Sequence, residues 1–203
     1  LTDIDLSSIW NVQANTTFTG QFDGNGFSIK NITISSNNSN YGLLGSTNGA
    51  TIKNLKLGGN IVYDIPTDSI SQLFLGTIVG VGTSTNISNC EVGDVNYKDG
   101  QETFSKILGR EGKIETKTKF TFGGIAGKLE SASTLNNCIT YLQGDFSCTL
   151  SAPSPVKIGG LAGVIDNSYL LNLASFNRIN VCATSSNITF YCGGIVGEVQ
   201  GDK

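Results

Sequence analysis

The sequence predicts an all-β fold, a right-handed parallel β-helix (β-solenoid) of about five to six coils in one domain, residues 1–203. Three observations predict it: an unusual composition, a glycine-bounded phrase that recurs five times, and an asparagine phrase that recurs in step with it. Charged residues make up 14% of the chain, below the roughly 25% of an ordinary soluble domain. Gly and small polar residues replace them, which indicates many short strands joined by tight turns.

The glycine-bounded phrase places small or apolar residues between glycines. Its five copies lie at 41–45, 75–80, 123–127, 159–163 and 193–197, and their last glycines are 35, 47, 36 and 34 residues apart. A phrase of this kind favours a strand that bends, or a backbone that passes close to its neighbour. Thr77 replaces a glycine in the second copy, so we expect that turn to pack differently.

The second phrase reads apolar-X-Asn-apolar and contributes one asparagine per copy. These asparagines are Asn31, Asn54, Asn89, Asn137 and Asn172. A polar side chain that recurs once per coil predicts a buried amide ladder, in which each side chain bonds to those above and below. Units that cannot close a core alone must stack on copies of themselves, which is the repeat architecture of a solenoid.

The opening residues and the repeats together resemble a known family. Asp3-Ile4-Asp5-Leu6, Trp10 and the run Phe-Thr-Gly-Gln-Phe-Asp-Gly-Asn-Gly at 18–26 precede the Gly-Leu-Leu-Gly phrase. This pattern resembles the GLUG-repeat family of surface proteins, adhesins and some secreted peptidases, and the resemblance covers essentially the whole chain. It implies a right-handed parallel β-helix, an extracellular setting and no catalytic residues within the repeats.

Residues 98–119 form a charged insertion that accounts for the 47-residue spacing and carries ten charged side chains. We expect its first half to be a solvated loop, with a short helical turn near 104–108. Its second half alternates between apolar or Thr and charged residues from Ile114 to Phe120, which predicts a strand. The alternative function for this insertion is a contact site for a partner or a neighbouring subunit.

The chain offers little for catalysis. It contains no His, the commonest general base and metal ligand. Glycosidase chemistry needs two carboxylates across a cleft, and Asp3, Asp5, Asp64 and Asp68 show no such pattern. Asp23 lies in an Asp-Gly-Asn-Gly run that predicts a turn. We therefore expect no enzyme, no cofactor and no metal, with a carbohydrate-binding or carbohydrate-active (lyase- or glycosidase-like) β-helix as the alternative.

The five cysteines suggest pairs on successive coils. Cys90 and Cys138 each follow a ladder asparagine, and Cys148 and Cys182 are near-equivalent. Stacked strands lie about 4.8 Å apart, inside the Cα separation that a disulfide allows. We expect Cys90–Cys138 and Cys148–Cys182 to be neighbours, either disulfide-bonded or stacked as buried thiols that fill the core, and Cys192 to be a buried free thiol.

Several sequence features bear on location. Asn-X-Ser/Thr acceptors occur at Asn15, Asn31, Asn37, Asn86 and Asn187. We expect glycosylation at Asn15, Asn37, Asn187 and Asn86, whereas Asn31 belongs to the ladder and should be buried. No apolar run approaches the roughly 20 residues of a membrane span. The net charge of −3 excludes a broad basic face for nucleic acid.

The expected function is an extracellular structural or adhesive module, such as a surface-coat or filament subunit. The chain begins without Met, and its last glycine phrase is followed only by residues 198–203, without an amphipathic capping helix. We therefore expect it to be part of a longer chain or assembly. Self-association or contact with neighbouring domains would run through the solenoid ends, and surface glycans are possible ligands.

Overall fold

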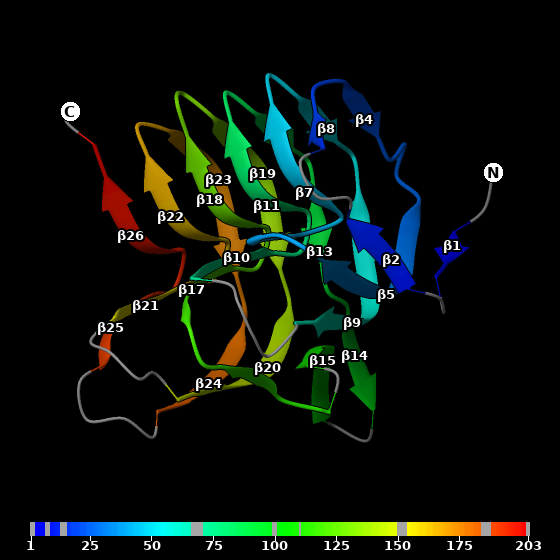
Figure 1. The fold of residues 1–203 in the computed structure, drawn as a ribbon. Helices are drawn as coiled ribbons and strands as arrows, with labels where there is room; N and C mark the ends of the chain where they lie inside the picture. The colour runs from blue at the N-terminus through cyan, green and yellow to red at the C-terminus, as the bar shows by residue number, and fades with distance from the viewer. Residues whose placement is uncertain are drawn as a thin grey trace.

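The computed structural model describes residues 3–6, 9–12, 16–65, 71–98, 101–109, 111–149, 154–183 and 188–201. Within these ranges the secondary structure consists of β-strands, with no helix. The strands form three sheets in which almost all pairs are parallel (Figure 1). The expected all-β class is confirmed.

The largest sheet, sheet 1, has 15 strands. Its strands are β1 (Ile4–Asp5), β2 (Ile9–Val12), β4 (Gln21–Asp23), β5 (Ser28–Ser36), β8 (Thr51–Lys53), β9 (Lys56–Asp64), β12 (Asn86–Ser88), β13 (Glu91–Val92), β14 (Val95–Lys98), β15 (Gln101–Gly109), β16 (Ile114–Thr116), β19 (Thr134–Thr140), β20 (Leu142–Cys148), β23 (Tyr169–Ser175) and β24 (Arg178–Ala183).

The two smaller sheets carry the glycine phrases at their junction. Sheet 2 has six strands: β3 (Thr17–Phe18), β7 (Leu44–Asn48), β11 (Val79–Thr83), β18 (Ala126–Glu130), β22 (Ala162–Asp166) and β26 (Val196–Gln200). Sheet 3 has five strands: β6 (Asn40–Tyr41), β10 (Gln72–Gly76), β17 (Lys119–Gly123), β21 (Ser154–Gly159) and β25 (Ile188–Gly193).

The chain visits the sheets in a fixed order, from sheet 3 to sheet 2 to sheet 1. We call one such pass a circuit and number the circuits 1 to 5 by their sheet 3 strands, β6, β10, β17, β21 and β25. The strands β3, β4 and β5 form a partial circuit that precedes circuit 1. Each strand pairs in parallel with the equivalent strand of the next circuit, so that Val79 lies between Leu44 and Ala126. The sequence period of the glycine phrases is therefore the spacing between paired strands.

The glycine phrases form the corner between sheets 3 and 2, which we call the glycine corner. A Cβ atom added to Gly123 would lie 2.6 Å from the backbone nitrogen of Gly163 in the next circuit. No side chain fits there, so this position of the corner requires glycine. In circuit 2 the second glycine is replaced by Thr77, whose side chain is fully buried and whose Oγ1 lies 3.4 Å from the Tyr63 hydroxyl.

The asparagine phrases form a second corner, within sheet 1, which we call the asparagine corner. All five asparagines have a left-handed φ of 51–57°, a conformation that Asn tolerates better than most residues. The corner interrupts the usual in–out alternation of a strand: Ile87 and Cys90 are buried while Asn89 between them is exposed. Each copy thus redirects the chain while keeping apolar residues on both sides in the core.

The core lies between the three sheets as columns of equivalent residues. Ile52, Ile87 and Leu135 are aligned across successive circuits, and all three are fully buried. Aromatic rings also pack within circuit 3, where the rings of Phe120 and Phe146 stack with centroids 5.3 Å apart. Each circuit therefore buries its apolar side chains both within itself and against its neighbours.

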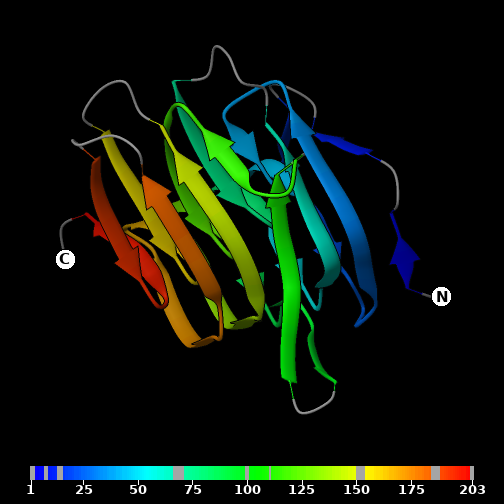
Figure 2. The ribbon, with the colours of Figure 1, turned by 90° about the horizontal axis from the view of Figure 1, so that it is seen from below.

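The charged insertion forms a β-hairpin rather than a loop with a helical turn. β14 and the first half of β15 pair antiparallel, and the hairpin projects from the stack (Figure 2, green). The expected helical turn at 104–108 is wrong because β15 continues into sheet 1, where Ile107 pairs with Ile61 and Gly144. Strand partners on both sides outweigh a weak local helical preference. The strand expected from Ile114 forms in two pieces, β16 and β17.

Candidate functional site

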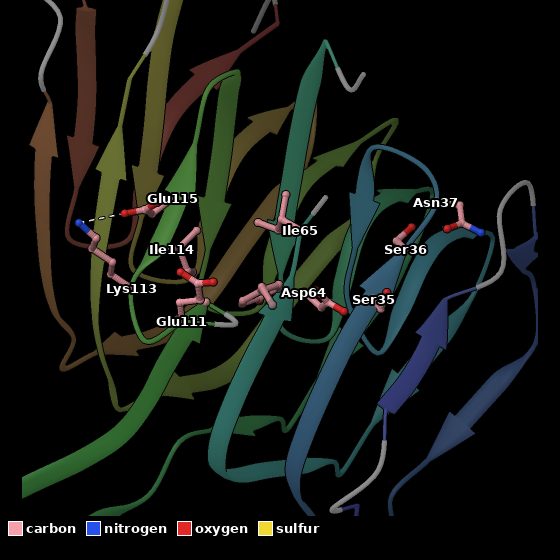
Figure 3. A pocket seen from close by; sticks show the side chains of 11 residues that line it. Ser35, Ser36, Asn37, Asp64, Ile65, Glu111, Lys113, Ile114 and Glu115 are labelled. Carbon is pink, nitrogen blue, oxygen red and sulfur yellow. Dashed lines mark ion pairs between the residues drawn. The ribbon is translucent and has the colours of Figure 1, made fainter. Parts of the chain in front are cut away.

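A polar groove with a volume of about 490 Å³ lies beside the ends of β5 and β9 in sheet 1 (Figure 3). We call it the acidic groove. Ser35, Ser36 and Asn37 line one side, and the segment from Glu111 to Glu115 lines the other. Asp64 and Ile65 lie between these two sides. Three successive circuits therefore contribute to one surface feature.

The charges of the acidic groove are three carboxylates, on Asp64, Glu111 and Glu115, and one ammonium, on Lys113. Lys113 Nζ lies 2.9 Å from Glu115 Oε1, and the hydrogen bond between them raises the pKa of Lys113. The Glu115 side chain is 65% exposed, so it does not lie in the buried setting that favours a general acid. The groove is suited to hydrogen bonding with a polar ligand more than to acid–base chemistry.

The tyrosines near the acidic groove belong to the core. Tyr63 lines it but is fully buried, and burial raises the pKa of its phenol. Tyr41 is also fully buried, with a raised pKa for the same reason, and its hydroxyl donates to the Ser36 carbonyl at 2.9 Å. Both phenols stay neutral at physiological pH and hold the groove wall in place.

Asp23, the carboxylate singled out by its turn sequence, is occupied by structural contacts. Its Oδ1 accepts hydrogen bonds from the Asn25 backbone N–H at 2.9 Å and from Asn54 Nδ2 at 3.0 Å. Its Oδ2 lies 3.3 Å from Lys53 Nζ. The bond from Asn54, then that from Asn25, lowers the pKa of Asp23. These contacts are those of a turn residue that also joins two circuits.

The structure brings three of the five predicted ladder asparagines into one chain of side-chain hydrogen bonds. Asn89 Nδ2 donates to Asn54 Oδ1 at 3.3 Å, and Asn137 Nδ2 donates to Asn89 Oδ1 at 2.8 Å. Asp23 accepts from Asn54 at one end of this chain. Asn172 follows in the same register, opposite Asn137. We call this column the amide ladder.

Asn31 lies outside the amide ladder. Its Nδ2 donates to Asp5 and its Oδ1 accepts from the Asn60 backbone N–H, both at 3.1 Å, at a bulge where β5 shifts register against β9. The expectation of a buried ladder is also wrong: Asn89, Asn137 and Asn172 are exposed, and Asn54 and Asn31 are half-buried. The left-handed backbone turns these side chains outward while their apolar neighbours face the core.

The two expected cysteine pairs differ in the structure, and neither is joined by a disulfide. Cys90 and Cys138 are both buried, and their strands align them side by side. Cys182, in contrast, lies opposite Ser147, and Cys148 lies opposite Ala183. A shift of one residue places two side chains on opposite faces of a sheet, which explains why Cys148 is buried and Cys182 exposed.

Cys192 has the expected neighbour but not the expected burial. It pairs with Ile158 in register, as the alignment of the phrases predicts, yet it is exposed. β25 is the outermost described strand of sheet 3. No further described circuit stacks on it, so its side chains lack the neighbours that bury Ile158. The expectation of a buried thiol is wrong for this reason.

Two of the expected glycosylation sites are described, and both are accessible. Asn37, on the rim of the acidic groove, and Asn86, at the start of β12, are exposed. Asn15 and Asn187 lie outside the described residues. Asn31 is half-buried with both side-chain polar atoms hydrogen-bonded.

Comparisons with family models, with curated proteins and with solved structures found no match to this chain. No helix long and apolar enough to cross a membrane occurs in the described ranges. Nor do those ranges hold a group of three or more Cys, Asp or Glu side chains placed to bind a metal ion.

Sequence reasoning missed the acidic groove and one contact of the hairpin. The groove combines short segments of three circuits, and only the charges at 111–115 signalled it. The guanidinium carbon of Arg178, from β24, lies 4.5 Å from the centre of the Phe104 ring, and its Nη2 lies 3.3 Å from Glu102 Oε2. Nothing in the sequence links these residues, because strand pairing across β20 brings them together.

Proposed function

We propose that the chain is a right-handed parallel β-helix of the GLUG-repeat type, and that it serves as a structural or adhesive module of a secreted or surface-displayed protein. The observation that carries this proposal is the repetition of two corners in register over successive circuits. Repeats of this kind lengthen the stack and extend its surface, and they do not bring several side chains together in one active site. In this role the chain is not an enzyme and uses no cofactor.

The outer surface supports an extracellular role. It carries many Asn, Ser and Thr side chains and two accessible glycosylation acceptors, Asn37 and Asn86. Glycans at these positions would leave the strand pairing intact, since both side chains are exposed. Mass spectrometry of the natural protein tests this point, and unmodified Asn37 and Asn86 would weigh against the secreted setting.

The last circuit supports a role in assembly. Apolar side chains that would belong to core columns are exposed there, including Phe190 at 39% and Val199 at 66%. Large exposed apolar patches mark interaction surfaces, so we propose that another coil stacks here, from a neighbouring domain or a second copy.

Negative-stain electron microscopy of the protein isolated from its natural source tests the assembly role. Regular filaments or arrays are the expected result, because end-to-end stacking would extend the sheets. Single short rods would contradict the filament role and leave an adhesive module.

The acidic groove favours a second candidate function, carbohydrate binding. Hydroxyl, amide and carboxylate groups line it, and these are the groups that hydrogen-bond sugar hydroxyls. Isothermal titration of oligosaccharides against the natural protein and its Glu111→Gln/Glu115→Gln variant tests this. Binding that the variant loses would support the second function, whereas equal binding would place the glycan site elsewhere.

A further inference from the structure

Cys90 and Cys138 face each other across two successive circuits. Cys90 lies between β12 and β13, and Cys138 lies within β19. Strand pairing on both sides, of Ile87 with Leu135 and of Glu91 with Ile139, sets the two cysteines directly opposite. Paired parallel strands lie about 4.8 Å apart, within the roughly 4.4–6.8 Å between Cα atoms that a disulfide requires.

The two thiols also share an orientation and an opening to solvent. Each Sγ–H donates to the carbonyl two residues earlier, Cys90 to Ser88 and Cys138 to Asn136, both at 3.2 Å. A surface groove of about 330 Å³ is lined by both cysteines, by amide-ladder asparagines and by Lys56 and Glu91. A small reagent can therefore approach the pair, although each side chain is almost fully buried.

The electrostatics divide the two thiols into a nucleophile and a partner. A hydrogen bond between them lowers the pKa of Cys90 and raises that of Cys138. Cys90 therefore loses its proton more readily than Cys138. The thiolate is the reactive form of cysteine, so attack on an oxidant begins at Cys90.

We propose that Cys90 and Cys138 are a dithiol site that a small-molecule disulfide oxidises to a covalent link between circuits 2 and 3. The Cys90 thiolate attacks one sulfur of the reagent, and a mixed disulfide forms as one thiolate leaves. Cys138 loses its proton to that leaving group and attacks Cys90 Sγ, which expels the second thiolate. Two cysteines are oxidised, and one disulfide is reduced to two thiols.

The position of this pair gives the link a structural consequence. The chain between Cys90 and Cys138 includes the hairpin of β14 and β15 and most of the longest interval between successive glycine phrases, which is 47 residues. A cross-link that closes a long segment restricts the unfolded chain most. The link would thus fix the register of circuits 2 and 3 at the point where the repeat is interrupted.

Cys148 and Cys182 provide a matched control within the same chain. They also lie on neighbouring strands, but Cys182 is opposite Ser147, so the two side chains point to opposite faces. The proposal therefore predicts one specific link among the five cysteines. It does not depend on the proposed structural role, since the experiment supplies the oxidant.

The test incubates the reduced protein with oxidised glutathione, blocks the remaining thiols and maps cross-linked peptides by mass spectrometry. We expect a Cys90–Cys138 peptide, and a melting temperature higher than that of the reduced protein by roughly 5–15 °C. The Cys148→Ala/Cys182→Ala/Cys192→Ala variant should keep both results. The Cys138→Ala variant should instead accumulate glutathione on Cys90.

Two outcomes would overturn the proposal. One is a folded wild-type protein in which Cys90 and Cys138 remain unlinked at every glutathione ratio. The other is a Cys148–Cys182 link that forms as readily as the Cys90–Cys138 link. Peptide mapping of the wild-type protein decides both, so the test stands even if a cysteine variant fails to fold.

Discussion

The glycine corner and the asparagine corner both turn the chain, but they do so by opposite means. Both change the direction of the chain once per circuit, but the glycine corner does so by removing side chains where backbones nearly touch. The asparagine corner keeps its side chain, turns it outward through a left-handed φ and bonds it to the next circuit. The first corner is therefore set by packing, and the second by backbone conformation.

The difference predicts that the glycine corner tolerates substitution least. A Cβ atom at Gly160 would overlap the Gly194 carbonyl oxygen and the Ser175 side chain, whereas one at Gly194, the same position one circuit later, would meet nothing within 4 Å. We expect Gly160→Ala to lower the free energy of unfolding by about 3 kcal/mol or more. Gly194→Ala should change it by less than about 0.5 kcal/mol.

Urea denaturation of both variants measures this contrast. Equal stability of the two variants would show that the close approach of backbones does not determine the glycine corner. A large loss for Gly194→Ala only in the assembled natural protein would instead show that another coil covers the last circuit.

A smaller effect is expected at the asparagine corner. Asn89 has a φ of 53° and sits between two bonded neighbours in the amide ladder. Asn89→Ala should cost about 1–2 kcal/mol because Ala disfavours this conformation. Asn89→Gly, which accepts the conformation but loses the ladder bonds, should cost less, about 0.5–1 kcal/mol. The same denaturation measurement applies, and a cost for Gly as large as that for Ala would contradict the claim that the left-handed backbone conformation sets this corner.

The hairpin differs from both corners because a side chain from circuit 4, Arg178, contacts it and holds it in place. Arg178 stacks on the buried ring of Phe104 and pairs with Glu102, and both charged side chains are exposed. We expect Arg178→Ala to cost only about 0.5–1 kcal/mol. Hydrogen exchange should accelerate in β14 and the outer half of β15 and stay unchanged in β19, while Arg178→Lys should lie between. Faster hydrogen exchange throughout the chain would contradict a local role for Arg178 in holding the hairpin.

The smallest effect is a pH dependence at the end of the amide ladder. Hydrogen bonds lower the pKa of Asp23 below its ordinary 3.8 in the folded protein. Its contribution to stability is therefore full above pH 3.8 and is lost as the pH falls through the lower folded value. NMR titration should find this lowered pKa, and Asn54→Ala should move it back toward 3.8. An ordinary pKa in the unsubstituted protein would contradict the bonding described for Asp23.

The sequence predicted the repeated parts of the fold well, because each recurring residue has a local physical reason. The glycine phrases, the positions of the asparagines and the alignment of Cys90 with Cys138 follow from spacing alone. Burial of the ladder could not be read this way, since the left-handed φ of Asn89 reverses the alternation on which such arguments rest.

Features that depend on contacts between circuits escaped prediction. The path of β15 is set by its partners β9 and β20, and the one-residue offset of Cys182 from Cys148 appears only once strands are paired. The acidic groove combines side chains far apart in the sequence, such as Ser35 and Glu115. Composition and spacing do not indicate which distant residues become neighbours in the fold.

Removal of one whole repeat tests the central claim, that the circuits are interchangeable units stacked in register. Deletion of residues 128–163 joins Gly127 to Val164, which lies at the position equivalent to Lys128. We predict a soluble β-protein that unfolds cooperatively with a smaller denaturant slope, while deletion of residues 146–163, half a circuit, should not fold. If both deletions unfold the chain, or if both leave it folded, the stacking of equivalent circuits is contradicted.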